Sequence, residues 1–410
     1  MSEPLANDYD HHRALDHWDP DAAHAQLRAE CPVAHTDAHG GYWVVTAYDL
    51  VTECARDPEV FSSDHDLDGS RVGIEFGGIG IPAEPNHRSI PAEVDPPRFQ
   101  GFRRVLQPGF TPATTAAWAD RARGWADACL DRHVGSGRID LVLDVANPVP
   151  AMVTLGLVGL PVDEWERYAA PLHWLVYTQP GSPEKLAARA AVVELRDVIR
   201  QAVVERRGHP RHDLASAVAH ATIDGGPITE DDAVNTLFSV ISGGVDTTTA
   251  LLANAFVWLH HHPDVRARLV DEPDLRPAAR EEFLRVFSPA PATARTTTRP
   301  VSLGTVELDR AERVLLSWTA ANRDPAVFDD PGSVDVERDA HRHVAFGAGP
   351  HRCIGAPLGR AEFDAILDAV LDRIPDYVVD EDAAHRYARV GAVNGWATIP
   401  ATFAPHPDGS

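Results

Sequence analysis

The ten residues FGAGPHRCIG, at positions 346–355, place one cysteine among three glycines. The segment after Pro357 has apolar residues at helical spacing, so Cys353 should stand just before a helix N-terminus. The positive end of the helix dipole and the free N–H groups of Ile354 and Gly355 would then favour a thiolate over a thiol. The first chemistry that this sequence suggests is that of an ionised sulfur.

The glycines around the cysteine indicate what the sulfur would touch. Gly347, Gly349 and Gly355 have no side chains, so the backbone can lie close to a flat group. Phe346 is placed to cover one side of the sulfur. A thiolate held in this way is a suitable axial ligand for haem iron. The alternative, a buried cysteine in a glycine-rich turn, would be preferred only if the motif stood alone.

The pattern F-G-x-G-x-H-x-C-x-G resembles the haem-binding signature of the cytochrome P450 monooxygenases, and every position agrees. The resemblance implies haem b as the cofactor, Cys353 as the ligand of its iron, and contacts from Phe346 and Gly355. It further implies a mainly α fold with small β-sheets, in which a long central helix lies over the haem.

A second motif precedes the cysteine. Glu282 and Arg285 resemble the ExxR motif of the same family, and Arg338 would complete a three-residue network. Taken alone, the pair reads as an ordinary surface ion pair between residues three apart, worth a few tenths of a kcal/mol. The order of the motifs along the chain favours a buried, structural network, which is costly to break.

The stretch SGGVDTTT, at positions 242–249, is a poor helix interior because Gly243 and Gly244 each cost about 1 kcal/mol relative to Ala. A kink or a close helix crossing would explain the glycines equally well. The resemblance, here to [AG]-G-x-[DE]-T, favours an oxygen-activating site. It implies that Thr247 hydrogen-bonds the oxygen and that Asp246 relays protons from solvent.

Haem propionates need cationic or hydrogen-bonding partners when they are buried. The resemblance places Arg103, Arg295 and His351 at the corresponding positions. Family members often have a histidine four residues before the first of these arginines, but this chain has Phe99 there. One propionate contact is therefore lost or replaced.

The resemblance also places a substrate pocket around the front of the long helix, the strand after the ExxR helix and the last hairpin. Its expected wall residues are Ser239, Ser242, Pro291, Thr293 and Val393. They suggest a roomy or partly polar pocket for a hydrophobic organic molecule. The Gly- and Pro-rich loop before Asp95 is a candidate lid.

Electrons must come from a separate protein, because the chain has neither a flavin domain nor a Gly-rich dinucleotide motif. An acidic ferredoxin could dock on a basic patch beside the cysteine. The arginines expected in that patch are Arg103, Arg104, Arg342, Arg352 and Arg360.

The net charge of -24 argues against nucleic acid as a partner. We expect no apolar stretch to reach the roughly 20 residues of a membrane span, and the N-terminal residues show no secretory leader. We therefore expect a cytoplasmic protein, taken as a monomer.

Hydrophobic periodicity predicts long helices over 111–134, 183–207 and 230–261. The last would be about 48 Å long at 1.5 Å per residue. Strand-like segments are few, near residue 43, at 301–308, at 313–318 and near the C-terminus. We expect one cytochrome P450 domain over residues 1–410, with loose ends at 1–20 and 404–410.

The expected activity is insertion of one atom of O2 into a substrate, by hydroxylation or epoxidation. Oxidative coupling or a peroxide-driven reaction is an alternative within the family. A haem-based sensor or binding protein without turnover is an alternative from another class, and it would have no need for Asp246 and Thr247.

Overall fold

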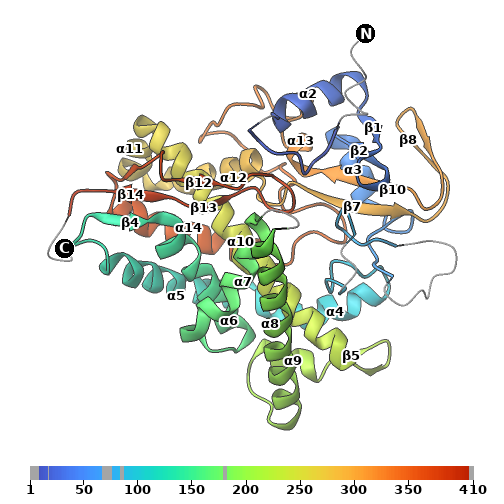
Figure 1. The fold of residues 1–410 in the computed structure, drawn as a ribbon, viewed down its shortest axis with the longest axis horizontal. Helices are drawn as coiled ribbons and strands as arrows, with labels where there is room; N and C mark the ends of the chain where they lie inside the picture. The colour runs from blue at the N-terminus through green and yellow to red at the C-terminus, as the bar shows by residue number, and fades with distance from the viewer. Residues whose placement is uncertain (1–8, 17, 67–75, 84–86, 179–181, 406–410) are drawn as a thin grey trace.

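The computed structural model describes residues 9–16, 18–66, 76–83, 87–178 and 182–405. Helices make up most of it, and in Figure 1 most of them lie to one side of the largest sheet, while α2, α3 and α13 lie beside that sheet. The helices are α2 (Pro20–Glu30), α3 (Tyr48–Arg56), α4 (Arg98–Leu106), α5 (Pro112–Asp131), α6 (Pro148–Val158), α7 (Trp165–Tyr177), α8 (Pro183–Gly208), α9 (Leu214–Ala219), α10 (Glu230–His261), α11 (Pro263–Asp271), α12 (Arg276–Phe287), α13 (Trp318–Ala321) and α14 (Ala356–Arg373).

Short strands form the remaining regular structure. The largest sheet has the order β1 (Val33–Thr36), β2 (Tyr42–Val45), β10 (Arg313–Ser317), β7 (Ala292–Thr297) and β3 (Phe61–Ser62). Within it only β10 and β2 pair in parallel. The smaller sheets are β11 (Val378–Val379) with β14 (Pro400–Thr402) and β4 (Arg138–Asp140), β12 (His385–Arg386) with β13 (Trp396–Thr398), β5 (Thr222–Ile223) with β6 (Gly226–Pro227), and β8 (Val301–Leu303) with β9 (Val306–Leu308).

The predicted mainly α architecture is confirmed, and α10 has the predicted bounds. Its N-cap, Thr229, accepts a hydrogen bond from the N–H of Asp232, and three acidic residues occupy the first turn. At the other end α11 begins directly with Pro263, which cannot continue the preceding helix. In Figure 1, α10 runs through the middle of the molecule.

The start of the described chain is packed, so the loose end expected over 1–20 does not include residues 9–16, while residues 1–8 lie outside the described residues. Tyr9 is buried, and its carbonyl accepts a hydrogen bond from the Thr36 hydroxyl at 2.7 Å. The N–H of Leu15 donates to the carbonyl of Ala388 at 2.9 Å. Residues 9–16 thus join the largest sheet to the C-terminal hairpin. Most of the other expected loose end, 406–410, lies outside the described residues.

Two helical stretches are long and apolar enough to span a membrane by composition, Leu141–Val158 and Glu230–His261. The first, with a mean hydropathy of 1.7, is longer than the sequence suggested, because Pro148 and Pro150 lie in the first turn of α6 and do not interrupt it. In the first stretch 78% of the apolar residue window is buried inside the protein, and in the second 67%. Such burial is typical of core helices.

Candidate functional site

The loop around Cys353 is shaped by two glycines in the left-handed region of backbone space. Gly347 has a φ of 72° and Gly349 a φ of 67°, which side chains disfavour. A Cβ on Gly349 would also lie 2.1 Å from the carbonyl oxygen of Ala55, so the loop packs on the end of α3 through bare backbone. The N–H of Cys353 then donates to the carbonyl of Phe346 at 2.8 Å, which closes the loop.

Cys353 stands three residues before the start of α14, and the residue as a whole is exposed although protein atoms surround its sulfur. Burial by the surrounding protein raises the pKa of the thiol. The backbone N–H groups of Gly355 and Ala356 oppose that rise in pKa, as do the charges of Arg103 and Arg352. These two N–H groups are one residue further along than the sequence predicted, and all four groups favour a thiolate.

Three basic side chains lie close to one another beside this loop. Arg295, on β7, is buried, and burial lowers the pKa of its guanidinium to about 10. Burial lowers the pKa of His351 to about 3, and the charges of Arg295 and Arg103 add to that effect. Among the described residues, no carboxylate lies within ion-pair distance of Arg295, and Nδ1 of His351 is buried without a hydrogen-bond partner.

Phe99 occupies the place where a histidine was expected. Its ring lies 4.4 Å from the ring of His351, and the guanidinium of Arg103 stands 5.7 Å from its centroid. Phe99 therefore packs against two of the predicted cofactor-binding side chains and contributes orientation in place of a hydrogen bond.

The middle of α10 presents one accessible face within a mostly buried helix. Ser239, Ser242, Gly243 and Thr247 are at least partly accessible and follow helical spacing, while Ile241, Val245 and Asp246 between them are buried. The Thr247 hydroxyl donates to the carbonyl of Gly243 at 2.8 Å. The helix continues through this stretch without interruption. Ser239, Ser242 and Thr247 thus share the open face of α10.

The two glycines of this stretch have different surroundings. A Cβ on Gly244 would lie 2.3 Å from Oγ1 of Thr154, so α10 and α6 cross closely there. A Cβ on Gly243 would meet nothing within 4 Å. Both interpretations of the glycine pair therefore apply, the close helix crossing to Gly244 and an open site to Gly243.

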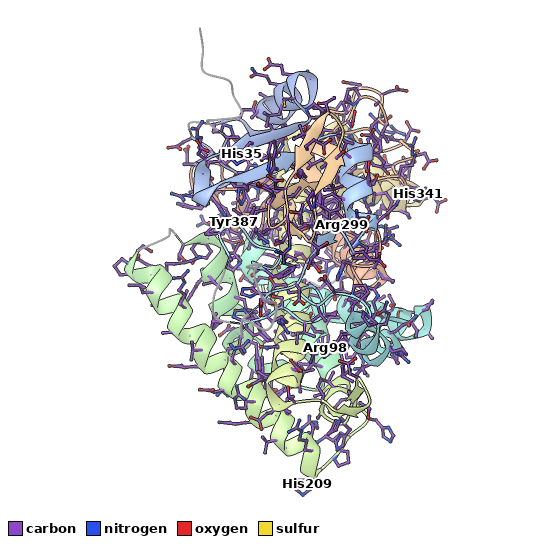
Figure 2. The ribbon with its side chains drawn as sticks, turned by 90° about the vertical axis from the view of Figure 1, so that its right-hand side faces the viewer. His35, Arg98, His209, Arg299, His341 and Tyr387 are labelled. Atoms are coloured by element: carbon purple, nitrogen blue, oxygen red, sulfur yellow. The ribbon has the colours of Figure 1, made fainter. Side chains whose placement is uncertain are left out.

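Asp246 is buried, although helical spacing places it next to Ser242 and Gly243 on α10. Its Oδ1 lies 2.9 Å from Nδ1 of His173 on α7. The hydroxyl of Tyr387, on the segment between β12 and β13, lies 3.3 Å from the same ring nitrogen. Figure 2 shows Tyr387 near the boundary between the sheet-rich and the helical parts. In this arrangement Asp246 contacts a buried histidine, and its predicted role in relaying protons stays a prediction.

The structure brings Glu282, Arg285 and Arg338 together, with Glu282 and Arg285 fully buried. Glu282 accepts from Nε and Nη2 of Arg285, both at 2.7 Å, and from Nε of Arg338 at 3.1 Å. Arg285 also donates to the carbonyls of Asn322, Pro331 and Ser333. All five of its N–H donors are thereby used.

Comparison with known proteins decides the family. A family model described as "Cytochrome P450" matches residues 183–374. Over 379 residues the chain is 33% identical to the cyclomarin C epoxidase CymV of Salinispora arenicola, covering 91% of this chain and 92% of that protein. The chain belongs to the cytochrome P450 family.

Other cytochrome P450 proteins are similar along most of their length. The putative cytochrome P450 YjiB of Bacillus subtilis is 30% identical over 368 residues, which is 88% of each chain. The solved structure of the open cytochrome P450 EryK from S. erythraea has a TM-score of 0.84 and 27% identity, covering 98% of this chain and 100% of that one. The predicted family and fold are thus confirmed.

Cytochrome P450 proteins bind haem b, and the residues described above fit that group. Haem iron needs an axial ligand from the protein, and the sulfur of Cys353, just before α14, can supply it. The two haem propionates need cationic or hydrogen-bonding partners when they are buried. The buried Arg295, the unpartnered Nδ1 of His351 and the nearby Arg103 can serve as those partners. Cys353 would hold the iron of this P450, and the three basic side chains would hold the propionates.

The expected basic patch is smaller than the sequence suggested. Arg360 forms two hydrogen bonds, at 2.8 and 2.7 Å, with the buried Glu281, and its guanidinium stacks 4.6 Å from the ring centroid of Phe346. Arg103 donates to the carbonyl of Arg352 at 2.7 Å. Two of the five arginines are thus engaged within the protein, while the three exposed ones are Arg104, Arg342 and Arg352.

The expected pocket residues outside α10 divide between different surroundings. The Thr293 hydroxyl lies 3.3 Å from Nη1 of Arg295, so both side chains occupy one face of β7. Pro291 lines a separate cavity, described below. Val393 packs in a buried cluster with Ala250. The loop expected to act as a lid lies partly outside the described residues.

Sequence reasoning missed two buried groups next to the oxygen-activating stretch. One is His173, which gave no signal in the sequence because it is a single histidine within an ordinary helical pattern. The other is Glu362 of α14, which accepts from the Thr248 hydroxyl at 3.1 Å. Burial raises the pKa of Glu362 to about 8. A signal for Glu362 existed, because it falls on the apolar stripe of α14 between Leu358 and Ile366.

Proposed function

We propose that this P450 inserts one oxygen atom from O2 into a hydrophobic organic substrate, by hydroxylation or epoxidation, with electrons supplied by a separate ferredoxin and its reductase. The observation that carries this proposal is the adjacent pair Asp246 and Thr247, one side chain buried against His173 and the other on the open face of α10. CymV, 33% identical, is named an epoxidase, which supports the same class of reaction.

Haem bound through Cys353 supplies the binding and reduction of dioxygen. The chain itself must supply protons and limit the access of water. Thr247 holds its hydroxyl at the carbonyl of Gly243, beside open space, where it can donate or accept a hydrogen bond. Its neighbour Asp246 shares a hydrogen bond with His173 inside the protein.

A carboxyl group that turns between His173 and Thr247 would carry a proton from the interior side of α10 to its open side. Because His173 and Asp246 are both buried, this route admits protons without an open water channel. A peroxide-driven enzyme would have no need for such a relay. The pair therefore favours the O2-dependent reaction over the peroxide-driven one.

The test is coupling efficiency in the Thr247→Ala holoenzyme. With a substrate found by its low-spin to high-spin shift, we expect about tenfold less product per NAD(P)H and a matching rise in hydrogen peroxide, since hydroxyl-assisted proton transfer contributes about 10²–10⁴-fold. Haem content and substrate affinity should be unchanged.

Thr236→Ala is the matched control, because Thr236 on the same helix makes the same type of bond, from its hydroxyl to the carbonyl of Asp232 at 2.7 Å. Unchanged coupling in Thr247→Ala would contradict the relay. If no compound caused substrate-dependent NAD(P)H consumption in the native protein, the sensor alternative would be favoured.

The ferredoxin proposal rests on the exposed Arg104, Arg342 and Arg352 of an acidic protein. Local positive charge would steer an acidic partner, and salt would weaken that steering. We expect the bimolecular rate of reduction to fall several-fold between low and physiological ionic strength, and again in an Arg104→Gln, Arg342→Gln double variant. Arg299→Gln, an exposed arginine outside the patch, is the control. A rate that is independent of salt would contradict docking at this surface.

A further inference from the structure

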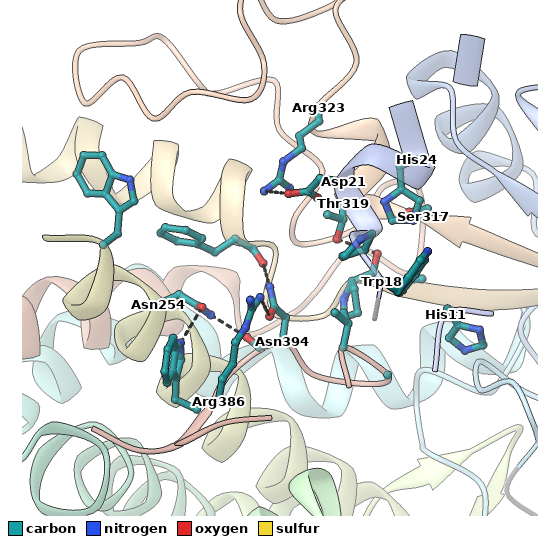
Figure 3. Close-up of a pocket in the computed structure, with 18 of the residues that line it drawn as sticks. His11, Trp18, Asp21, His24, Asn254, Ser317, Thr319, Arg323, Arg386 and Asn394 are labelled. Atoms are coloured by element: carbon teal, nitrogen blue, oxygen red, sulfur yellow. Dashed lines mark hydrogen bonds and ion pairs between the residues drawn. The ribbon is translucent and has the colours of Figure 1, made fainter. Parts of the chain in front are cut away.

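A cavity of about 270 Å³ lies between the N-terminal segment, the C-terminal half of α10 and the C-terminal hairpin. Figure 3 shows residues from these elements around it, with His24 and Trp18 on one side and Asn254 on the other. Its volume is just below the usual range for pockets that bind small organic molecules, roughly 300–1,000 Å³. The cavity is therefore large enough for a compact ligand.

The cavity lies on the face of β7 opposite to the predicted propionate-binding side chain. Side chains alternate between the two faces of a strand. Thr293 and Arg295 contact each other on one face, at 3.3 Å, whereas Ala292 lines the cavity. Ala294, two residues on from Ala292, packs in the same buried cluster as Tyr9. β7 therefore separates the cavity from the haem side of the sheet.

Several aromatic side chains line the cavity. Trp18, Trp258, Trp396 and Phe287 all line it, and they come from different parts of the chain. Aromatic rings favour offset or edge contacts with other rings and bury a large apolar area. The lining is thus suited to a flat, apolar body.

Charged groups at the cavity do not balance. Nη2 of Arg323 lies 3.1 Å from Oδ2 of Asp21, while Arg386 donates to the amide oxygen of Asn394 at 3.1 Å. Figure 3 shows the first pair and the second pair at different sides of the cavity. Two arginines against one aspartate leave one positive charge among the lining residues that the structure describes.

Two residues that line the cavity each have a polar atom that lacks a partner among the described residues. Nη1 of Arg323 is buried and makes no hydrogen bond, and neither does Nδ1 of the buried His24. Nε2 of His24 lies 2.9 Å from the Tyr9 hydroxyl and 3.4 Å from that of Ser317. When Nε2 accepts from these hydroxyls, the proton of the neutral ring lies on Nδ1 and is free to be donated. Burial lowers the pKa of His24 to about 3, so the ring is neutral.

We propose that this cavity binds a small aromatic carboxylate at a site separate from the haem. The aromatic side chains take the ring system, and the carboxylate meets the unpartnered N–H groups of Arg323 and His24. The remaining positive charge of the lining, on Arg386, adds to the attraction from the other side. An ionised acceptor forms stronger hydrogen bonds with such donors than a neutral one. This proposal does not depend on the proposed monooxygenase reaction.

The experiment measures binding of 2-naphthoate to the holoenzyme by calorimetry and by quenching of tryptophan fluorescence. We expect saturable binding with no change in the haem absorption spectrum, and at least tenfold weaker binding of the uncharged 2-naphthamide. Arg386→Gln should weaken 2-naphthoate binding at least tenfold, as should Arg323→Gln. Arg299→Gln, which leaves the cavity unchanged, should bind as the native protein does.

Ala292→Phe provides a second variant that retains both arginines and fills the cavity, and it should abolish binding. Three results would overturn the proposal: no binding of 2-naphthoate to the native holoenzyme, unchanged binding in Arg386→Gln and Ala292→Phe, or displacement of the probe by an imidazole ligand of the haem iron. The last result would place the probe at the haem. Loss of coupling in Thr247→Ala is measured separately, so this proposal and the proposed function can fail independently.

Discussion

Individual residues carry the chemistry of this P450, and the most unusual of them is a buried carboxyl group. Glu362 accepts one hydrogen bond, from Thr248, and its Oε1 has no partner among the described residues. Burial raises its pKa from the ordinary 4.5 to about 8. The folded protein therefore keeps this proton over a pH range in which the unfolded chain releases it.

This difference predicts how stability depends on pH. As pH rises from about 4.5 to about 8, the contribution of Glu362 to stability should fall, because the unfolded state gains the favourable ionised form first. Glu362→Gln removes this loss, so the variant should be more stable than the native protein by about 2–4 kcal/mol at pH 8. Near pH 4.5 the two proteins should differ little.

Urea unfolding at several pH values, followed by circular dichroism, measures this effect. Glu59→Gln, at an exposed position, should follow the native protein throughout. A constant difference between Glu362→Gln and the native protein across the pH range would show that Glu362 is not protonated in the folded state.

At this scale the sequence identified residue types and neighbours along the chain but missed contacts across it. The pattern around Cys353 predicted an accessible sulfur before a helix, because the glycines and the following helix are local features. It could not predict that Asp246 contacts His173, since these residues are 73 positions apart and are joined only by the packing of α7 on α10. For the same reason, the engagement of Arg360 by Glu281 was not foreseen.

At the scale of elements, α10 must present an open face and also pack closely on its other sides. Gly244 provides the close crossing with α6, where a Cβ would lie 2.3 Å from Oγ1 of Thr154. Gly244→Ala should therefore destabilise the protein by about 1–3 kcal/mol, since Thr154 is buried and has little room to move.

Gly243→Ala is the matched control on the same helix, because a Cβ there meets nothing within 4 Å. It should leave stability unchanged or raise it, since Ala is the better helix former by about 1 kcal/mol. Combining Gly244→Ala with Thr154→Ala should restore part of the lost stability. Equal denaturation midpoints for the two single variants would argue against the close crossing.

Elements with strong local signals were predictable, including α10, whose cap, first-turn acids and terminal proline all lie in the sequence. The predicted helix over 111–134 ends at Asp131 in the structure, because residues 132–137 form a turn that leads into β4. The order of the strands β1-β2-β10-β7-β3 could not be predicted, since it pairs strands within residues 33–62 with strands within residues 292–317.

At the scale of the whole molecule, the Glu282–Arg285–Arg338 network joins α12 to the segment that leads to the cysteine loop. Arg285 donates to carbonyls at positions 322, 331 and 333 as well as to Glu282. Arg285→Lys keeps the charge but cannot make five bonds in a planar fork. We expect a loss of about 3–5 kcal/mol, because Glu282 would be left buried and partly unpaired.

The readouts are the denaturation midpoint and the haem content of the purified protein, both of which should fall. Arg268→Lys, in an exposed ion pair with Glu272, should change neither. An Arg285→Lys protein with native haem content and an unchanged midpoint would show that the network does not stabilise the cysteine loop.

The packed N-terminal segment has a consequence for how the molecule holds together. Ala14 bridges to Arg389, and Leu15 donates to Ala388, so residues near one end of the chain are fastened to residues near the other. Tyr9 and Trp18 of the same segment also line the aromatic cavity. A truncated protein that begins at Pro20 would therefore lose the contacts that hold the last hairpin, and it would also lose one wall of that cavity.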